Sequence, residues 1–354
     1  MAFNDEISQF TVATKNHADN FNDVNNKLLE NDLYLRERIN EVEKNNETNS
    51  VKNFGAKGDG VTDDTEAIQN AINNCDSLFF PEGVYIISKG IYMTKPINIF
   101  GRGVNSIIRL INSAGKIDMV NCNGVDNLTI KDICIDGNKD NLVDNTVEVV
   151  CLKLLSCTRV SLMNVTIINS TIEGAYLYKC KFCNITNCIF EGNGFYRTDA
   201  SGLHIDTCSY CNVSNCCMIE NGFHGLIMSS ATYCNLFNLQ LNSNGWDGAR
   251  VQWSSNYNSF GNIQSAYNTR GIYFIEESNH NNLSNCYINN NEGVGVASNN
   301  SQDNIVFLSN IFNNLGNGYE LVSETDTITF SQCLFAGNTL GDGTYPDGAT
   351  VIIK

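Results

Sequence analysis

Charged side chains are scarce in the second half of this 354-residue chain, so those present are candidates for chemistry. Between Lys181 and Lys354 the only basic residues are Arg197, Arg250 and Arg270. The same stretch holds His204, His224, His280, Trp246 and Trp253, together with Asp199, Asp206 and Asp247. Aromatic planes stack on sugar rings, arginine forks bind hydroxyls and carboxylates, and paired carboxyls hydrolyse glycosides. These residue types together indicate a site for a sugar polymer.

A glycine recurs at a nearly fixed spacing and predicts how these residues are arranged. The ladder is Gly174, Gly202, Gly225, Gly248, Gly271, Gly295 and Gly318, at spacings of 28, 23, 23, 23, 24 and 23. A second ladder keeps step with it through Asn164, Asn187, Asn215, Asn238, Asn262 and Asn285. A period in the twenties indicates a solenoid, and short alternating runs such as 203–206 indicate strands. We therefore expect an all-β, single-stranded parallel β-helix of about 23 residues per turn; no leucine-rich pattern occurs.

Both ladders lengthen by five residues between 187 and 215, which indicates one insertion near 195–200. The repeat then aligns the candidates in columns. Glu173, Ser201, His224, Asp247 and Arg270 precede the ladder glycine, and Tyr176, His204, Ile227, Arg250 and Tyr273 follow it by two residues. Adjacent strands lie ~4.8 Å apart, so the columns predict one outward surface. We expect His204, Trp246, Trp253, Arg197, Arg250, Arg270 and Tyr273 to bind substrate, with the insertion as one wall.

Several chemistries fit this surface. Asp247 is the first choice for acid or base, with Asp206 or Asp199 as its partner and His224 holding its charge. Asp206 and Asp247 lie about two rungs apart, near the ~9.5 Å upper limit for inverting hydrolysis. A lyase would instead use Arg250 or Arg270 to neutralise a uronate, with a tyrosine or histidine as base. A surface that only binds is the third reading, and the sequence leaves the identity of the glycan open.

Composition excludes other partners. The net charge of −16 argues against nucleic acid and against an anionic membrane surface. No apolar run reaches the ~18 residues that span a bilayer, and the N-terminus shows no export-signal pattern, so we expect synthesis without a signal peptide.

The cysteines recur with the repeat, as at Cys157, Cys180 and Cys208, which predicts buried thiols. Zinc at the C-x-x-C pairs and calcium at 136–144 or 276–277 are less favoured, so no metal or cofactor is expected.

Two segments precede the repeats. Residues 1–50 place Phe21, Leu28, Leu35 and Val42 seven apart, which predicts a helix that oligomerises and attaches the chain; a solvated helical leader is the alternative. Residues 51–110 are expected to form the cap and the first rungs, and residues 111–354 the body. In the cap, Asp63 or Asp64 should begin a helix whose Ala67, Ile68, Ala71 and Ile72 face inward.

The cap also carries a resemblance. The segments 54–65 (FGAKGDGVTDDT) and 80–85 (FPEGVY) resemble the N-terminal signature of the pectate-lyase-type right-handed β-helix superfamily, which includes pectinolytic enzymes and bacteriophage tailspikes. Residues 10–18 (FTVATKNHA) resemble attachment segments of phage tail appendages of Gram-positive hosts. The resemblance implies a right-handed β-helix and a homotrimeric spike on the virion, joined to the tail or baseplate through residues 1–50. Such a spike would bind, and in many cases cleave, host surface polysaccharide.

We expect about nine rungs in such a spike. A free bacterial polysaccharide lyase or glycoside hydrolase is the alternative from another class, and a non-catalytic structural tail component is the third.

Overall fold

The computed structural model describes residues 25–37, 49–112, 115–142, 147–195 and 197–354. The chain divides into two compact units, Met1–Ser50 and Val51–Lys354. In the first unit residues 25–37 are helical, and Leu28 and Leu35 are exposed on that helix. The other two positions of the predicted seam, Phe21 and Val42, lie outside the described residues, as does the segment 10–18.

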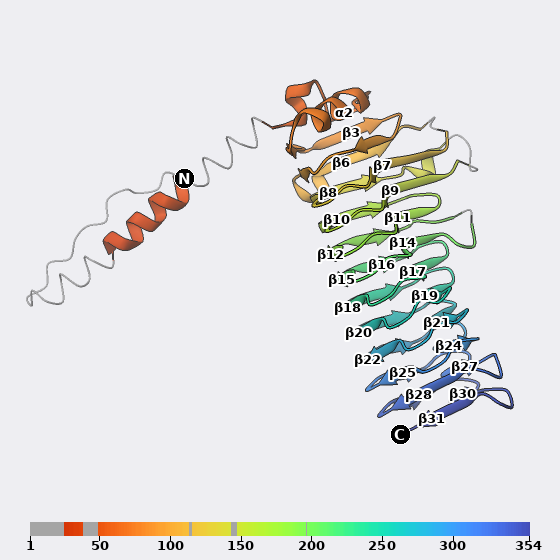
Figure 1. Cartoon of the computed structure of the whole chain (residues 1–354). Coiled ribbons are helices and arrows are strands. Elements are labelled where there is room, and N and C mark those ends of the chain that lie inside the picture. The colour runs from red at the N-terminus through yellow and green to blue at the C-terminus, as the bar shows by residue number, and fades with distance from the viewer. Residues whose placement is uncertain (1–24, 38–48, 113–114, 143–146, 196) are drawn as a thin grey trace, which may run out of the picture. The chain divides into compact units, whose positions relative to one another are not determined.

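The second unit is the predicted parallel β-helix, with its rungs stacked one on the next (Figure 1). Within the described part of the chain its second sheet holds eleven strands, which are β4 (Ile91–Met93), β7 (Ile117–Asn123), β9 (Val149–Leu155), β11 (Glu173–Tyr178), β14 (Ser201–Asp206), β17 (His224–Ser229), β19 (Asp247–Gln252), β21 (Arg270–Ile275), β24 (Val296–Asn299), β27 (Tyr319–Leu321) and β30 (Gly343–Thr344). The expectation of nine rungs is therefore wrong. The stack continues through strands at both ends that the glycine ladder does not mark.

The first sheet runs along the other sides of the coil. Its strands are β1 (Asp59–Asp63), β2 (Ser77–Phe79), β3 (Gly83–Ile87), β5 (Asn98–Phe100), β6 (Ser106–Leu110), β8 (Thr129–Asp136), β10 (Ser161–Ile168), β12 (Asn184–Thr186), β13 (Ile189–Glu191), β15 (Asn212–Ser214), β16 (Cys217–Ile219), β18 (Asn235–Asn242), β20 (Ser259–Ala266), β22 (Asn282–Ser284), β23 (Tyr287–Asn289), β25 (Asn304–Phe307), β26 (Asn310–Phe312), β28 (Thr327–Ser331), β29 (Leu334–Ala336) and β31 (Thr350–Ile353).

The asparagine ladder of the sequence marks the bend of this first sheet. Asn164, Asn187, Asn215, Asn238, Asn262 and Asn285 all have left-handed backbone, with φ between 53° and 55°. Asparagine tolerates that conformation better than most residues. Each member turns its strand from one side of the coil to the next, as Asn187 does between β12 and β13.

The glycine ladder marks a close approach between rungs. A Cβ on Gly225 would lie 2.7 Å from the Gly248 carbonyl oxygen and 2.7 Å from Asn244 Nδ2. Asn244 belongs to a buried amide column, and its Nδ2 donates to Asn268 Oδ1 and to the Met218 carbonyl, both at 3.1 Å. At Gly225 only a residue without a side chain fits where the strand passes this column.

The core is a continuous apolar interior that includes the predicted thiols. All fifteen cysteines are free, and all but Cys217 and Cys333 are buried, which confirms the interpretation of the cysteine columns. One column changes chemistry along the stack. Its positions are Cys183, Cys211, Cys234, Asn258, Asn281 and Asn304. At the change from thiol to amide, the backbone N–H of Cys234 donates to Asn258 Oδ1 at 2.9 Å.

A short helix covers the N-terminal end of the coil. This helix, α2 (Thr65–Asn74), buries Ile68, Ala71 and Ile72 as predicted, while Ala67 is partly buried. Asp63, rather than Asp64, binds the start of the helix, because its Oδ1 accepts from Thr65 N at 3.0 Å. The remaining helical turns are η1 (Val51–Phe54), η2 (Gly103–Asn105) and η3 (Lys139–Asn141). None of the described helices is long and apolar enough to cross a membrane.

Candidate functional site

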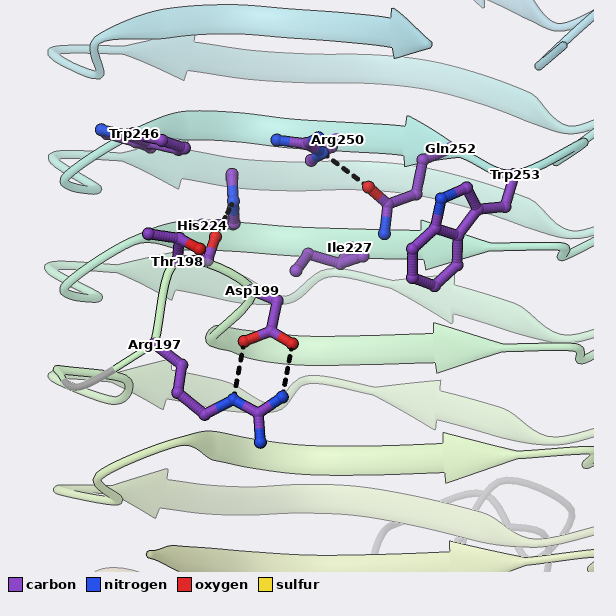
Figure 2. A pocket seen from close by; sticks show the side chains of 9 residues that line it. All are labelled: Arg197, Thr198, Asp199, His224, Ile227, Trp246, Arg250, Gln252 and Trp253. Atoms are coloured by element: carbon purple, nitrogen blue, oxygen red, sulfur yellow. Dashed lines mark hydrogen bonds and ion pairs between the residues drawn. The ribbon is translucent and has the colours of Figure 1, made fainter. Parts of the chain in front are cut away.

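Two adjoining hollows of about 620 Å³ and 320 Å³ lie on the outer face of the second sheet. Arg197, Asp199, Gln252 and Trp253 line both, so we treat the hollows as one groove. Strands β17 and β19 supply the floor of the larger hollow, shown in Figure 2. The smaller hollow continues over β7, β9 and β11. The predicted columns thus form the floor of a depression rather than a flat surface.

The insertion forms a wall of the groove. Arg197 and Asp199 make a two-pronged ion pair, with Nε–Oδ1 at 2.9 Å and Nη2–Oδ2 at 2.8 Å (Figure 2). The hydrogen bond from Arg197 keeps the pKa of Asp199 below its ordinary value, so this carboxylate is ionised and already engaged. Asp199 therefore does not have the free carboxyl that a hydrolase pair with Asp247 requires. Tyr196 lies outside the described residues.

Asp247 lies beneath the surface rather than on it, which corrects the expectation of an outward acid or base. Its side chain has no exposure, and Arg270 Nε and Nη2 donate to its two oxygens at 2.6 Å and 3.2 Å. Asp247 Oδ2 also lies 3.2 Å from His224 Nδ1, so the register pairs these two as predicted. Burial alone would raise the pKa of Asp247, but His224 and Arg270 outweigh it and lower that pKa. Asp247 is an ionised structural carboxylate that a polymer cannot reach.

The insertion contacts this column at His224. His224 is fully buried, and its Nε2 donates to the Thr198 carbonyl at 3.1 Å, which fastens the loop to the floor. Arg270 turns to Asp247 and lies 4.1 Å from the ring centre of Tyr273, which is also buried. Neither Arg270 nor Tyr273 lines the two hollows, so the structure does not place them where substrate contact was expected.

A chain of hydrogen bonds crosses four rungs under the groove. Glu173 Oε1 lies 3.0 Å from His204 Nδ1, and Ser201 Oγ donates to Glu173 Oε2 at 2.6 Å. His204 Nε2 lies 2.9 Å from Ser229 Oγ. Gln252 Nε2 donates to Ser229 Oγ at 3.1 Å, and Arg250 Nε donates to Gln252 Oε1 at 2.6 Å (Figure 2). Sequence reasoning placed Glu173, Ser201, His204 and Arg250 in neighbouring columns but assigned no role to Glu173, Ser229 or Gln252.

A second polar pair lies in the smaller hollow. Tyr176 donates its hydroxyl to Asp206 Oδ2 at 2.7 Å, and Thr207 Oγ1 donates to Asp206 Oδ1 at 2.8 Å. Burial and the Asp206 carboxylate both raise the pKa of Tyr176. The phenol therefore stays protonated at neutral pH.

The binding groups of the groove are two indoles and four cations. Trp253 is 52% exposed and Trp246 38%, so both present ring surface to solvent. Among the lining cations, Lys116 pairs with Glu148, Lys153 with Asp118 and Arg197 with Asp199. Arg250 is the lining cation for which the described residues offer no carboxylate partner. It faces the larger hollow between the two tryptophans (Figure 2).

The described residues contain no group of three or more histidines, cysteines or carboxylates arranged to hold a metal ion. In the segment considered for calcium, Asp136 pairs with Arg109 at 2.8 Å, and Asp144 lies outside the described residues.

Comparison with known proteins gives the family context. A family model described as rhamnogalacturonase A/epimerase, pectate lyase-like, matches residues 48–273, and one described as a right handed beta helix region matches residues 224–352. The pre-neck appendage protein of Bacillus phage phi29 is 30% identical over 136 residues, or 35% of this chain and 16% of that protein.

Alginate lyase 7 of Azotobacter vinelandii is 36% identical over 110 residues, covering 26% of this chain and 13% of that enzyme. The chain thus matches less than a fifth of the length of either curated relative. Among solved structures, the A-module of mannuronan C-5 epimerase AlgE4 from the same bacterium superposes with a TM-score of 0.74 at 20% identity. That superposition covers 86% of this chain and 97% of the module, and at this identity it shows a shared fold.

Proposed function

The chain belongs to the rhamnogalacturonase A/epimerase, pectate lyase-like family of right-handed β-helix proteins, and on that premise we propose that it is a phage appendage protein that binds a bacterial surface polysaccharide in the groove. The observation that carries this proposal is the groove itself. It combines two exposed indoles with Arg250, for which the described part of the chain offers no carboxylate partner, on a stack of strands. Indole planes suit sugar rings and a guanidinium fork suits hydroxyl or acidic groups.

The phage assignment draws on the similarity to the phi29 pre-neck appendage protein. Location on the virion, attachment to tail or baseplate through residues 1–50, and a homotrimeric state are parts of this proposal. The relative is much longer than the matched segment, so its own activity is not transferred to this chain.

Cleavage of the bound polymer is a second candidate function, and the Tyr176–Asp206 pair favours it. In an elimination, the Asp206 carboxylate would take the proton from the sugar carbon next to the acidic group as the C–O bond breaks, and Tyr176 would give its phenolic proton to the departing oxygen. The proton on Asp206 would then restore the phenol through their 2.7 Å hydrogen bond. The similarity to alginate lyase 7 is consistent with an elimination reaction. Hydrolysis through Asp247 is not proposed again, because that side chain is buried and paired.

The chain offers a direct test of binding, because it contains only two tryptophans and both line the groove. The purified protein would be titrated with a panel of bacterial surface polysaccharides while the tryptophan fluorescence is followed. A saturable change with at least one polymer is expected. No change with any polymer, together with no co-sedimentation, would leave a structural tail component as the better reading.

Cleavage is tested on the polymer that binds. New reducing ends with ultraviolet absorbance from an unsaturated sugar would indicate elimination, and reducing ends alone would indicate hydrolysis. Replacing Tyr176 by Phe removes the phenolic proton and should abolish either signal while polysaccharide binding persists. If binding occurs without new ends, the protein is a binding appendage without depolymerase activity.

A further inference from the structure

The hydrogen-bond chain beneath the groove has a fixed direction, because its two ends can each act in only one way. Arginine only donates hydrogen bonds and a carboxylate only accepts them. Arg250 Nε–H must therefore point to Gln252 Oε1, which turns the Gln252 amide so that Nε2–H points to Ser229 Oγ. At the other end, Glu173 Oε1 must accept from His204 Nδ1–H.

The middle of the chain follows from the ends. With its Nδ1 protonated, a neutral His204 offers the lone pair of Nε2 to the hydroxyl of Ser229, 2.9 Å away. Ser229 is fully buried, and Glu173, His204 and Gln252 are each less than a tenth exposed, so these bonds are shielded from water. Each of the four hydrogen bonds from Arg250 to Glu173, which lie three rungs apart, therefore joins a donor to an acceptor.

We propose that Glu173, His204, Ser229 and Gln252 act together as a positioning relay that holds Arg250 as the anion-binding residue of the groove. The ligand chemistry is an acidic group on the polymer, either a carboxylate or a phosphate. Gln252 binds Arg250 through Nε with a neutral oxygen, which fixes the guanidinium without neutralising it. A carboxylate at that position would occupy the cation, as Asp199 does with Arg197.

This inference rests on the proposed function but is tested separately from it. The decisive variant is Gln252→Glu, which keeps the length of the side chain and gives Arg250 a charged partner. The matched control is Gln264→Glu, which adds the same charge at an exposed position of β20 in the other sheet. Wild type and both variants would be titrated at constant ionic strength with inorganic phosphate and with polygalacturonate, using the tryptophan fluorescence as readout.

The wild type and Gln264→Glu should bind one of the two probes, and Gln252→Glu should lose about tenfold or more in affinity for it. Binding of phosphate alone would assign a phosphate-bearing polymer, and binding of polygalacturonate alone would assign a uronate. Equal affinity in all three proteins, or no response of the wild type to either probe, would overturn the anion-binding role. A polysaccharide that binds in the panel above would still support the proposed function in that case.

The direction of the relay has its own readout, which needs no ligand. Nitrogen-15 NMR of histidine-labelled wild type should show His204 as the neutral Nδ1–H tautomer at pH 8. Glu173→Gln should shift that signal and weaken probe binding several-fold, whereas Glu191→Gln, exposed on β13, should do neither. An Nε2–H tautomer or an imidazolium at His204 in the wild type would contradict the assigned direction, whether or not the Glu173 variant folds.

Discussion

At the scale of single residues, the site is governed by which carboxylates are free. Asp247 and Asp199 are each bound to an arginine, whereas the side-chain donors to Asp206 among the described residues are neutral, namely the hydroxyls of Tyr176 and Thr207. A buried carboxylate is stable only while its partners remain, because an isolated charge in the interior carries a large desolvation cost. Some charged groups near the groove thus stabilise the strands beneath it through ion pairs, and others are available to bind a ligand.

The first prediction concerns Asp247→Asn. Removing the charge leaves Arg270 and His224 without their anion, so the variant should lose about 3–5 kcal/mol of unfolding free energy. The measurement is chemical denaturation at neutral pH. Asp199→Asn is the control, because that pair is about half exposed and should matter by less than about 1 kcal/mol. Equal small losses for both would mean that Asp247 is not a structural anchor.

The second prediction is the pH dependence of the same pair. The pKa of Asp247 is lowered in the folded protein, so the native state binds this proton more weakly than the unfolded chain does. Its contribution is therefore complete above the ordinary value of 3.8 and is lost as the pH falls through the lowered pKa. The stability difference between wild type and Asp247→Asn should shrink on acidification below that value. A difference that stays constant or grows there would refute the assignment.

The sequence predicted which residues share a column, because the spacing of the repeat fixes the register. It did not predict which members of a column are exposed. Asp247 and His224 were expected to face outward, but the insertion places the Thr198 carbonyl against His224, and His224 and Arg270 contact the buried Asp247. The path of an insertion depends on contacts that no repeat encodes. The relay was missed because Ser229 and Gln252 are ordinary polar residues until their neighbours are known.

At the scale of elements, stacked side chains of one kind make the turns between strands. The buried column Asn193, Asn221, Asn244, Asn268, Asn291 and Asn314 satisfies backbone groups of successive rungs. Its spacing is as regular as that of the exposed asparagine ladder, so it could have been found from the sequence. Burial distinguishes the two columns, and it depends on which side of the strand faces the interior.

The third prediction tests the buried column. In Asn268→Ala, the backbone N–H and Nδ2 of Asn244 lose Asn268 Oδ1, and the Leu241 carbonyl loses its donor. Buried polar groups left unpaired should lower the unfolding free energy by about 3 kcal/mol, measured by thermal denaturation. Asn235→Ala removes the exposed hydrogen bond from Asn235 on β18 to Asn212 and should change stability by no more than about 0.5 kcal/mol. Similar effects at both sites would show that burial does not set the contribution of these stacked asparagines.

At the scale of the whole molecule, a β-helix gains length without gaining a new core, since each rung packs only on its neighbours. The repeat in the sequence therefore predicted the architecture correctly and undercounted the rungs, because strands such as β7 and β9 keep the packing without the ladder glycine. The assembly state does not follow from the repeat. The proposed homotrimer draws on the leader, where the described helix exposes Leu28 and Leu35.

The fourth prediction addresses that assembly. If the seven-residue seam joins three chains, light scattering of the full chain should give three times the 39.1 kDa mass. Replacing both Leu28 and Leu35 by Ser removes apolar surface from the seam and should shift the species toward monomer. A monomeric wild type, or a trimer that the double variant leaves intact, would rule out the leader as the oligomerising element.

The central claim, that the groove is a polysaccharide site, is tested most directly by one matched pair of variants. Trp253→Ala removes a half-exposed indole from the groove, and Tyr287→Ala removes a half-exposed ring from β23 on the other sheet. Affinity would be measured by calorimetry for a polysaccharide that the wild type binds. The account predicts a loss of roughly tenfold for Trp253→Ala and wild-type affinity for Tyr287→Ala. Unchanged binding by Trp253→Ala, or an equal loss in both variants, would contradict it.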